Sequence, residues 1–416
     1  MSFRIHPRVA AAAMLVLAAA CSNSTEPDSG KPGPVLDALP RALTAGEQRV
    51  IGAANDFSLA LFRRLGAAQK DTNVFTSPLS ASTALGMAMN GAAGATYDEM
   101  RTTLGFGTVS ETEIGESYKS LIALLRGLDP TVDFRIANSI WYRAGFPVHQ
   151  TFLDAGRNWF DARVSALDFG SPTAVPTIND WVSTATVGKI PTILETIRSD
   201  QIMFLINAIY FKGAWRTKFE PSRTIDAPFH AIGGDQPAKL MHRDGMMRLL
   251  RTAQFNAVDL PYGNGAYAMT IVLPNDGASI DAVTVSLQSA AWAAWMSQFN
   301  EADVDLYLPR FKLAWERGLI PDLEALGMRE AFVAGGADFT RMSPAGRDLY
   351  ISVVKQKTYV DVNEEGTEAA AVTNVGISVT SLPVRTPFRV DRPFIFVLRE
   401  RLSGTILFMG KVVRMP

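Results

Sequence analysis

One segment near the C-terminal end constrains the fold of this chain more than any other. Every second position from residue 367 to residue 379 is small or β-branched and uncharged: Thr367, Ala369, Ala371, Thr373, Val375, Ile377 and Val379. The positions between them form a more polar set: Glu368, Ala370, Val372, Asn374, Gly376, Ser378 and Thr380. This alternation is typical of a β-strand that buries one face. The flanks are typical of loops, since Gly366 precedes the segment and Pro383 and Pro387 follow it. We infer a segment that can join a sheet although it lies in a loop.

The N-terminal residues predict export. Arg4, His6 and Arg8 precede the apolar run 9–20, which ends at Cys21. This is the layout of a bacterial export signal, and the run is short for a membrane span. We therefore expect a signal peptide at residues 1–20 and an exported protein, extracellular or periplasmic.

The run Leu17-Ala18-Ala19-Ala20-Cys21 resembles a lipobox, in which the cysteine is lipidated and holds the protein to a membrane. The match is imperfect, because the leucine stands four residues before the cysteine rather than three. The alternative is an ordinary cleaved signal with an incidental cysteine. Cys21 is the single cysteine of the chain, so no intramolecular disulfide can form.

The remaining chain divides into a linker and one domain. Residues 21–43 are rich in Pro, Ser and Gly, which predicts a flexible tether. Residues 44–416 show no repeat and no further linker. Helical patterns concentrate early and strand patterns dominate later, so we expect a single α+β domain with large sheets.

Local patterns predict individual elements. Residues 44–65 have the periodicity of a helix, and 73–76 read as a short strand before a second helix that Ser77 or Ser80 caps, with Pro78 in its first turn. Residues 81–90 of this helix are apolar on nearly every side, which predicts burial. Strands are expected at 136–142, 203–211, 257–260, 267–273, 304–308, 350–354, 358–362, 394–399 and 405–413.

Composition and motifs exclude several function classes. The formal net charge is −1 and no run of five or more Lys or Arg residues occurs, which weakly disfavours nucleic acid as the main partner. His149, His230 and His242 lack the spacing of a zinc motif, and we expect no metal and no cofactor. No nucleophile elbow or phosphate loop is present, so nothing recommends an enzyme.

Eight motifs in order resemble the serpin family of serine protease inhibitors. They are Asn73 to Ser80, Ile178-Asn179-Asp180-Trp181 with Thr186 to Ile190, Asn207 to Trp215, Leu260-Pro261-Tyr262, Leu308 to Phe311, Leu326-Gly327-Met328 with Ala337-Asp338-Phe339, Glu364 to Ala371, and Asp391 to Phe394 with Phe408 to Val412. The resemblance spans residues 44–416. It implies a metastable serpin fold with a five-stranded main β-sheet, further sheets, about eight or nine helices and an exposed reactive loop.

The resemblance also implies a mechanism. A target protease attacks the reactive loop as a substrate and forms an acyl-enzyme, and the cleaved loop then inserts into the main sheet and distorts the trapped protease. The expected function is therefore inhibition of a serine-type endopeptidase by a suicide substrate that acts as a monomer. The alternatives are a non-inhibitory serpin that serves as a binding or chaperone-like protein and a lipid-anchored enzyme on an unrelated fold.

The family pattern places the reactive bond at Thr380-Ser381. The count from Gly366 and the motif Ser381-Leu382-Pro383 agree, whereas a count back from Pro393 lands two residues later. The neighbouring bonds Val379-Thr380 and Ser381-Leu382 stay open, and a proline makes Leu382-Pro383 a poor substrate.

Residues before the bond indicate the target class. Val379 and Thr380 favour an elastase-like or subtilisin-like serine protease, and a papain-like cysteine protease is a further candidate. Arg385 would attract a trypsin-like enzyme, but five residues beyond the expected bond.

Three groups of residues carry the implied mechanism. The hinge that starts insertion is Glu364, Glu365, Gly366, Thr367, Glu368, Ala369, Ala370 and Ala371, and its small residues speak against a non-inhibitory member. Insertion is gated by Trp215, Arg310 and Glu364, unless Arg310 and Glu364 are only a solvated surface pair. A polar cluster beneath the sheet comprises Ser77, Ser80, Asn207 and Gln356, where Gln356 replaces a histidine that is frequent in the family.

Overall fold

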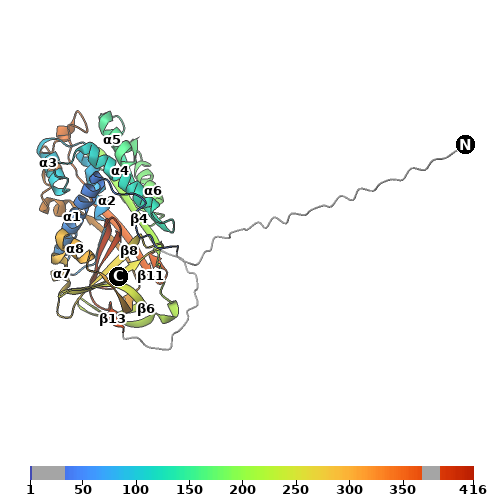
Figure 1. The fold of residues 1–416 in the computed structure, drawn as a ribbon. Helices are drawn as coiled ribbons and strands as arrows, with labels where there is room; N and C mark the ends of the chain where they lie inside the picture. The colour runs from blue at the N-terminus through green and yellow to red at the C-terminus, as the bar shows by residue number, and fades with distance from the viewer. Residues whose placement is uncertain (2–32, 368–384) are drawn as a thin grey trace. The chain divides into compact units, whose positions relative to one another are not determined.

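A computed structural model describes Met1, residues 33–367 and residues 385–416. Several expected features lie outside the described residues: the signal peptide after Met1, Cys21, the hinge residues Glu368, Ala369, Ala370 and Ala371, and the bond Thr380-Ser381. In the ribbon view, helices α3, α4 and α5 gather at one end of the domain and strands β6 and β13 at the other (Figure 1).

The described residues contain nine α-helices and three short 3-10 helices. The α-helices are α1 (Ala45–Ala68), α2 (Pro78–Met89), α3 (Gly94–Thr103), α4 (Glu111–Gly127), α5 (Gln150–Phe160), α6 (Ala174–Ala185), α7 (Ile280–Ser286), α8 (Ser289–Met296) and α9 (Ile320–Ala325). The 3-10 helices are η1 (Pro221–Arg223), η2 (Glu330–Phe332) and η3 (Gly346–Asp348).

The main sheet has the order β10-β11-β12-β4-β2-β3. Its strands are β10 (Phe311–Gly318), β11 (Lys355–Asn363), β12 (Gly366–Thr367), β4 (Met203–Ala214), β2 (Val132–Arg143) and β3 (Ala162–Leu167). Five of these are long, as expected for the family, and the sixth is a two-residue strand made by the hinge itself.

The second sheet has nine strands, in the order β1-β15-β14-β8-β7-β6-β9-β13, with β5 paired to β6. The strands are β1 (Val74–Thr76), β15 (Ile406–Val412), β14 (Phe394–Glu400), β8 (Tyr267–Pro274), β7 (Phe255–Pro261), β6 (Gly234–Arg251), β9 (Asn300–Pro309), β13 (Thr386–Arg389) and β5 (Ile225–Ala231). Strands β8, β14 and β15 are buried along their whole length and form the centre of the core.

The first two helices begin where the sequence predicts. Thr44 caps α1 in a reciprocal capping box with Glu47, which satisfies two free backbone N–H groups. Ser77 caps α2 and Pro78 occupies its first turn, so Ser77 rather than Ser80 is the capping residue. All but one residue of α2 are buried, because α2 lies beneath the main sheet and packs against β4 and β15.

The strand expected at residues 350–354 is absent from the structure. Residues 350–354 have no regular secondary structure, and β11 begins only at Lys355. Strand β10, the partner of β11, ends at Gly318, whose register partner is Lys355. Residues 350–354 therefore extend beyond the edge of their neighbour, so their backbone has no ladder to join.

The C-terminal end of the expected tether contacts the domain. Leu36, Leu39 and Leu43 pack against the hydrophobic core, and the Leu36 amide donates to the carbonyl oxygen of Asn264 over 2.9 Å. The three leucines are partly buried, and each contributes some apolar burial to the contact. Residues 33–43 thus contact the domain through a few partly buried leucines and this hydrogen bond.

Candidate functional site: the hinge and the seam of the main sheet

The hinge residues Gly366 and Thr367 already form a strand between β11 and β4. Thr367 lies opposite Val362 of β11 and opposite Gly213 of β4, and both pairings are antiparallel. Strands β11 and β4 therefore run parallel to each other, and β12 separates them. Away from β12, toward the starts of both strands, the described residues of β11 and β4 are not paired with each other. We call this opening between β4 and β11 the seam.

Thr367 points into the core, as the sequence alternation predicts for the first inward position. It is 2% exposed, and its hydroxyl lies 2.7 Å from the hydroxyl of Tyr262. Burial raises the pKa of Tyr262, so this phenol stays protonated and available for the hydrogen bond.

Trp215 organises the point where the hinge leaves β11. Its indole N–H donates to the carbonyl oxygen of Asn363 over 2.8 Å, and its backbone amide donates to the carbonyl oxygen of Glu365 over 2.9 Å. The indole ring stacks on Tyr262 with centroids 4.5 Å apart. One aromatic side chain thus contacts both the hinge and the residue that holds Thr367.

The expected gating pair is also brought together. Arg310 and Glu364 approach to 3.6 Å, with side-chain exposures of 47% and 9%. The other carboxylate oxygen of Glu364 accepts a hydrogen bond from the Thr224 hydroxyl over 2.8 Å. Because Arg310 is half exposed, the ion pair alone contributes under about 1 kcal/mol. The Glu364 carboxylate is therefore held by Arg310 and the Thr224 hydroxyl together.

A second ion pair lies beside the first. Lys218 and Glu365 approach to 2.6 Å, and both side chains are largely covered. The segment that carries Lys218 is held from below by Arg243, whose guanidinium donates to the carbonyl oxygen of Thr217 and lies over the ring of Phe219. Burial lowers the pKa of Arg243 to about 10.

The polar cluster lies beneath the seam and is divided between its two sides. On the β11 side, Gln356 accepts from the Ser77 amide and donates to the Ser77 carbonyl oxygen, at 3.1 and 2.7 Å. On the β4 side, Asn207 accepts from Ser80 and donates to Asn138. The Ser77 hydroxyl and the Ser80 amide join the two sides at 3.4 Å. Gln356 therefore supplies both a donor and an acceptor to this cluster and does not titrate near neutrality.

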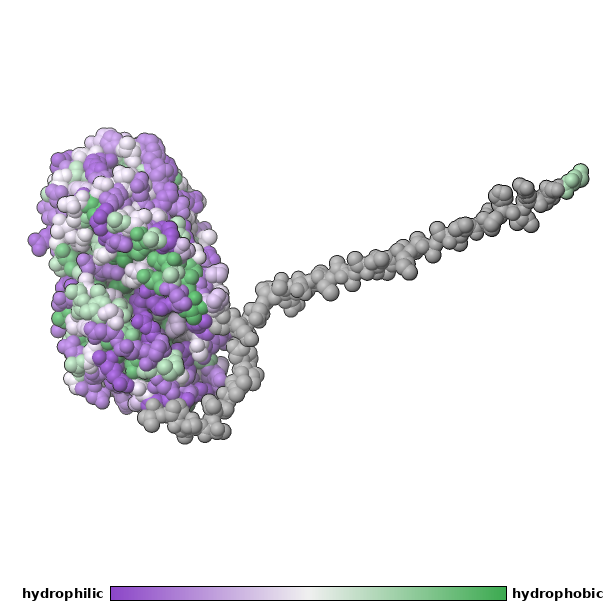
Figure 2. Space-filling model, viewed as in Figure 1, coloured by the Kyte–Doolittle hydropathy of each residue, from purple (hydrophilic) through white to green (hydrophobic). Residues whose placement is uncertain are grey.

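The part of the seam that lies farther from β12 holds a cavity of about 170 Å³. Its walls are mostly apolar and come chiefly from α2, the start of β4 and residues 349–354, and Asp200 and Leu349 are among the lining residues. Figure 2 shows hydrophobic residues gathered near the middle of the visible face of the domain. An empty apolar space beside unpaired strand edges is a place where a further strand gains both hydrogen bonds and burial.

Helix α6 covers the outer face of β2 and β4. Ile178 and Val182 of α6 pack with Trp141, Phe204 and Ile206 in a separate apolar cluster. The side chain of Asn179 bonds to the backbone of residues 193 and 194 and so fixes the segment that follows α6. This explains the asparagine of the second sequence motif.

Arg385 anchors the other end of the loop. Its guanidinium lies 2.7 Å from Asp244 and 3.3 Å from Asp303, and the side chain is 29% exposed. Burial alone would raise the pKa of Asp244, but a hydrogen bond from Arg223 and the charge of Arg385 lower it below its usual value. Because Arg385 is committed to two carboxylates, it is a poor side chain for a trypsin-like pocket.

Sequence reasoning missed several residues of this site. Tyr262 was recognised only as part of a motif, and Lys218, Thr224 and Asn138 carried no signal. Their partners are more than 60 residues away in the chain, so spacing could not reveal them. The remaining histidines lie elsewhere: His149 precedes α5, His230 pairs with Asp235, and His242 pairs with Asp305.

Comparison with known proteins decides the family. A family profile described as "Serpin (serine protease inhibitor)" matches residues 52–415. The chain belongs to the serpin family. Human Serpin B11 is 34% identical to this serpin over 381 residues, which are 86% of this chain and 97% of the relative. The leukocyte elastase inhibitor of Xenopus tropicalis is 33% identical, with 88% and 99% covered.

Solved structures agree on the fold. The thermophilic serpin tengpin in its native state superimposes with a TM-score of 0.82 at 29% identity, covering 93% of this chain and 98% of tengpin. Human thyroxine-binding globulin in complex with its ligand gives 0.81 at 28% identity, with 89% and 100% covered. The five long strands of the main sheet and the nine described helices are thus those of a serpin.

The described residues show neither a membrane-spanning helix nor a metal-binding cluster. No described helix is both long and apolar enough to cross a membrane. No group of three or more His, Cys, Asp or Glu side chains in the described ranges is arranged to hold a metal ion.

Proposed function

We propose that this serpin inhibits a serine protease as a suicide substrate and traps it by inserting the cleaved reactive loop into the seam. The observation that carries the proposal is β12: Gly366 and Thr367 are paired on both sides between β11 and β4, with Thr367 buried. A strand that has already begun in the seam requires only a free end to continue down it.

The register of β12 defines where each following residue would lie. If the antiparallel pairing continued past Thr367, Thr373 would lie opposite Asn207 and Gln356, at the polar cluster. The Thr373 hydroxyl would face polar partners there, whereas the inward residues before it, Ala369 and Ala371, would face apolar core. The polar cluster and the loop therefore match in chemistry as well as in register.

The same register supports Thr380-Ser381 as the reactive bond. If the register continued unchanged past the starts of β4 at Met203 and β11 at Lys355, Thr380 would lie opposite Asp200 and Leu349, which both line the cavity. A loop cleaved after Thr380 would therefore be long enough to run past the first residues of both strands. Cleavage at Arg385 would leave five residues of slack, and the anchoring of Arg385 by Asp244 and Asp303 also disfavours it.

The energy of insertion is sufficient for the task. About a dozen new ladder hydrogen bonds at roughly 1 kcal/mol each, together with the buried inward side chains, give on the order of ten kcal/mol or more. This is comparable to the roughly 5–15 kcal/mol that stabilises a typical protease domain. Distortion of the trapped enzyme is therefore within reach.

The fold alone does not distinguish an inhibitor from a carrier, because thyroxine-binding globulin shares it. The hinge composition does: Ala369, Ala370 and Ala371 can enter a sheet at little steric cost, whereas bulky or charged residues would stall. Val379 and Thr380 favour an elastase-like or subtilisin-like target, with a papain-like cysteine protease as a further candidate. The elastase inhibitors among the relatives support this preference.

The gating role and the location of the protein are part of the same proposal. The end of the seam next to β12 would be kept closed, until insertion starts, by Arg310, Glu364 and Trp215. Residues 1–20 would direct export, and Cys21 would either carry a lipid anchor or be incidental. Mass spectrometry of the mature N-terminus distinguishes these two outcomes, since lipidation adds a fixed mass to Cys21.

Incubation with elastase, subtilisin, trypsin and papain tests the function. We expect a complex with elastase or subtilisin that survives boiling in SDS and contains both chains. The active-site serine variant of the same protease is the control, since it cannot form an acyl bond. Cleavage of the loop by every protease without any such complex would contradict the proposal.

A further inference from the structure

The hydrogen bond between Tyr262 and Thr367 is isolated from solvent. Tyr262 and Thr367 are 0% and 2% exposed, and their hydroxyls lie 2.7 Å apart. If the hinge left the sheet, water would satisfy Thr367, whereas the Tyr262 hydroxyl would lose its partner. Each hydroxyl therefore favours the entered position of Gly366 and Thr367 only as long as the other is present.

Tyr262 begins a tight turn that is tied to the same part of β4 as the hinge. The Gly263 amide donates to the carbonyl oxygen of Ala214 over 3.0 Å, and Ala214 is the β4 partner of Gly366. The turn needs glycine at Gly263, where φ is +41° and a Cβ would lie 2.2 Å from the Thr131 hydroxyl. Turn, β4 and hinge thus form one connected unit.

The turn of residues 262–265 is braced from two sides. On the inner side, the Asn264 amide donates to the carboxylate of Asp129 over 2.7 Å. On the outer side lies the N-terminal segment 33–36, which we call the strap. The Leu36 amide donates to the Asn264 carbonyl oxygen over 2.9 Å, and Arg216 donates to the carbonyl oxygens of both Gly33 and Gly263, each over 2.9 Å.

Arg401 adds a second link between the strap and the turn. Its guanidinium donates to the carbonyl oxygen of Leu36 over 3.1 Å and to that of Gly265 over 2.8 Å. Two arginines therefore each bridge the strap to the turn. Four hydrogen bonds of this kind are more than a passing contact of an N-terminal tail requires.

We propose that Tyr262 is a positioning residue that holds Gly366 and Thr367 in the sheet, and that the strap acts on it by bracing the turn 262–265. The N-terminal segment that follows the signal thereby contributes to setting how readily the hinge enters the seam. This inference deepens the proposed function, since hinge entry starts the insertion. It is tested on the uncleaved protein alone, so a failure to trap any protease would leave the outcome of this test unaffected.

Hydrogen exchange of the full-length protein measures hinge opening directly, in a peptide that contains Gly366 and Thr367. Tyr262→Phe removes one hydroxyl, leaves the other buried without a partner, and should speed exchange of this peptide on the order of tenfold. Thr367→Val should do the same from the other side. The double variant removes both hydroxyls and should return exchange to within about twofold of the wild-type rate.

The rescue separates positioning from a general packing role. If Tyr262 merely supported the core, Tyr262→Phe would speed exchange of the hinge peptide both in the wild-type background and in the Thr367→Val background. Unchanged exchange in Tyr262→Phe, or a double variant at least as fast as the singles, would overturn the proposal. Thr367→Val changes only the hinge, so it remains informative if Tyr262→Phe folds poorly.

The strap is tested by Leu36→Pro, which lacks the amide that bonds Asn264. We expect severalfold faster exchange of the hinge peptide in the wild-type background and little further increase in the Tyr262→Phe background. Arg41→Ala is the matched control, because Arg41 fastens the chain that follows the strap to Glu47 and Ser120, away from the turn. Equal effects of Leu36→Pro and Arg41→Ala, or equal effects of Leu36→Pro in both backgrounds, would contradict the role of the strap.

Discussion

Gly366 lies directly against the backbone of Gly213. A Cβ at residue 366 would be 2.1 Å from the carbonyl oxygen of Gly213, and φ of Gly366 is +153°. Such an overlap cannot be relieved by rotating a flexible side chain, since the atom it meets belongs to the backbone. Glycine is therefore required at residue 366, where the hinge enters between β11 and β4.

Gly366→Ala should displace the entered hinge residues. We expect faster hydrogen exchange of the hinge peptide and a rise in the number of inhibitor molecules consumed for each protease trapped, because the cleaved loop meets the same obstacle. Gly318→Ala is the control, since Gly318 ends β10 and a Cβ there meets nothing within 4 Å. Equal behaviour of the two variants would show that residue 366 does not pass through this contact.

Thr367→Arg should convert the inhibitor into a substrate. The side chain would enter the core beside Tyr262, where a buried guanidinium without a partner costs several kcal/mol, so insertion would lose the race against hydrolysis of the acyl-enzyme. Thr367→Val, which has nearly the same volume and no charge, should still form complexes. Full complex yield with Thr367→Arg, measured by SDS gel, would refute the inward orientation during insertion.

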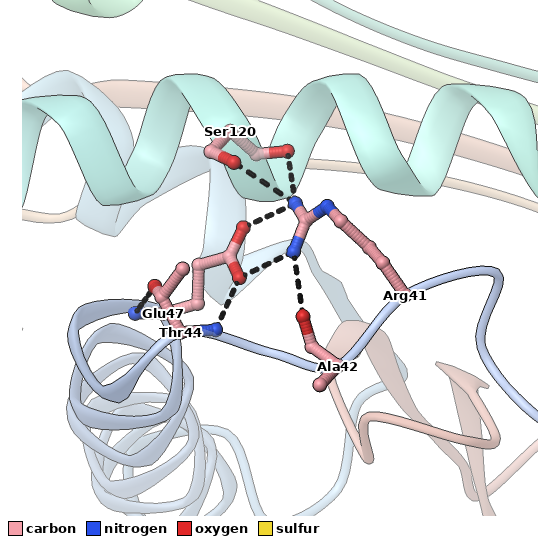
Figure 3. Close-up of polar contacts among 5 residues, drawn as sticks. All are labelled: Arg41, Ala42, Thr44, Glu47 and Ser120. Atoms are coloured by element: carbon pink, nitrogen blue, oxygen red, sulfur yellow. Dashed lines mark hydrogen bonds and ion pairs between the residues drawn. The ribbon is translucent and has the colours of Figure 1, made fainter.

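The start of helix α1 predicts a pH dependence. Figure 3 shows Arg41 forked onto the Glu47 carboxylate, with the Thr44 amide donating to the same group. The hydrogen bond from Arg41 outweighs burial and lowers the pKa of Glu47 from 4.5 to about 2. A carboxylate with a lowered pKa stabilises the fold fully above its ordinary pKa and loses this contribution as the pH falls toward the lowered value.

Urea unfolding between pH 6 and pH 2.5 tests this contribution. Glu47→Gln should cost about 1 to 2 kcal/mol near pH 6, and the difference from wild type should shrink as the pH falls from 4.5 toward 2. Glu113→Gln, which breaks the exposed pair with Arg49, should change the profile much less. A Glu47→Gln difference that is constant across this range would exclude the ion pair as its source.

The fold was predictable from the sequence because its signals are local or dense. Patterns of neighbouring residues indicate the cap at Thr44, the helix start at Pro78 and the buried strands. The order of the motifs predicted the topology through the family resemblance, because hydrophobic periodicity alone does not determine how strands are arranged in a sheet. The strand expected at residues 350–354 failed because a strand also needs a partner, and Gly318 ends β10 before that point.

The site was predictable only where it coincides with motifs. The hinge alternation placed Thr367 inward, but nothing in the sequence indicated that Tyr262 would meet it across the fold. The composition of residues 33–43 predicted a tether, and the contacts of Leu36 with a distant turn could not be foreseen. Long-range partners of this kind depend on the finished packing rather than on spacing.

Cleavage of the loop should stabilise the protein. Completing the strand between β4 and β11 adds ladder bonds and fills the cavity of about 170 Å³. Nicking the loop with a protease that is not trapped should therefore raise the melting temperature by tens of degrees. An unchanged melting temperature of the nicked, still associated chains would identify a non-inhibitory member of the family.

The central claim is that a protease is trapped by a loop cut where the seam ends. Mass spectrometry of the C-terminal fragment released from the covalent complex with elastase or subtilisin tests it most directly. The family pattern and the register of Gly366 and Thr367 between β11 and β4 predict a fragment that begins at Ser381, since a loop cut after Thr380 is long enough to run past the first residues of both strands. A fragment that begins at Thr386, or a fragment released without any covalent complex, would contradict the account.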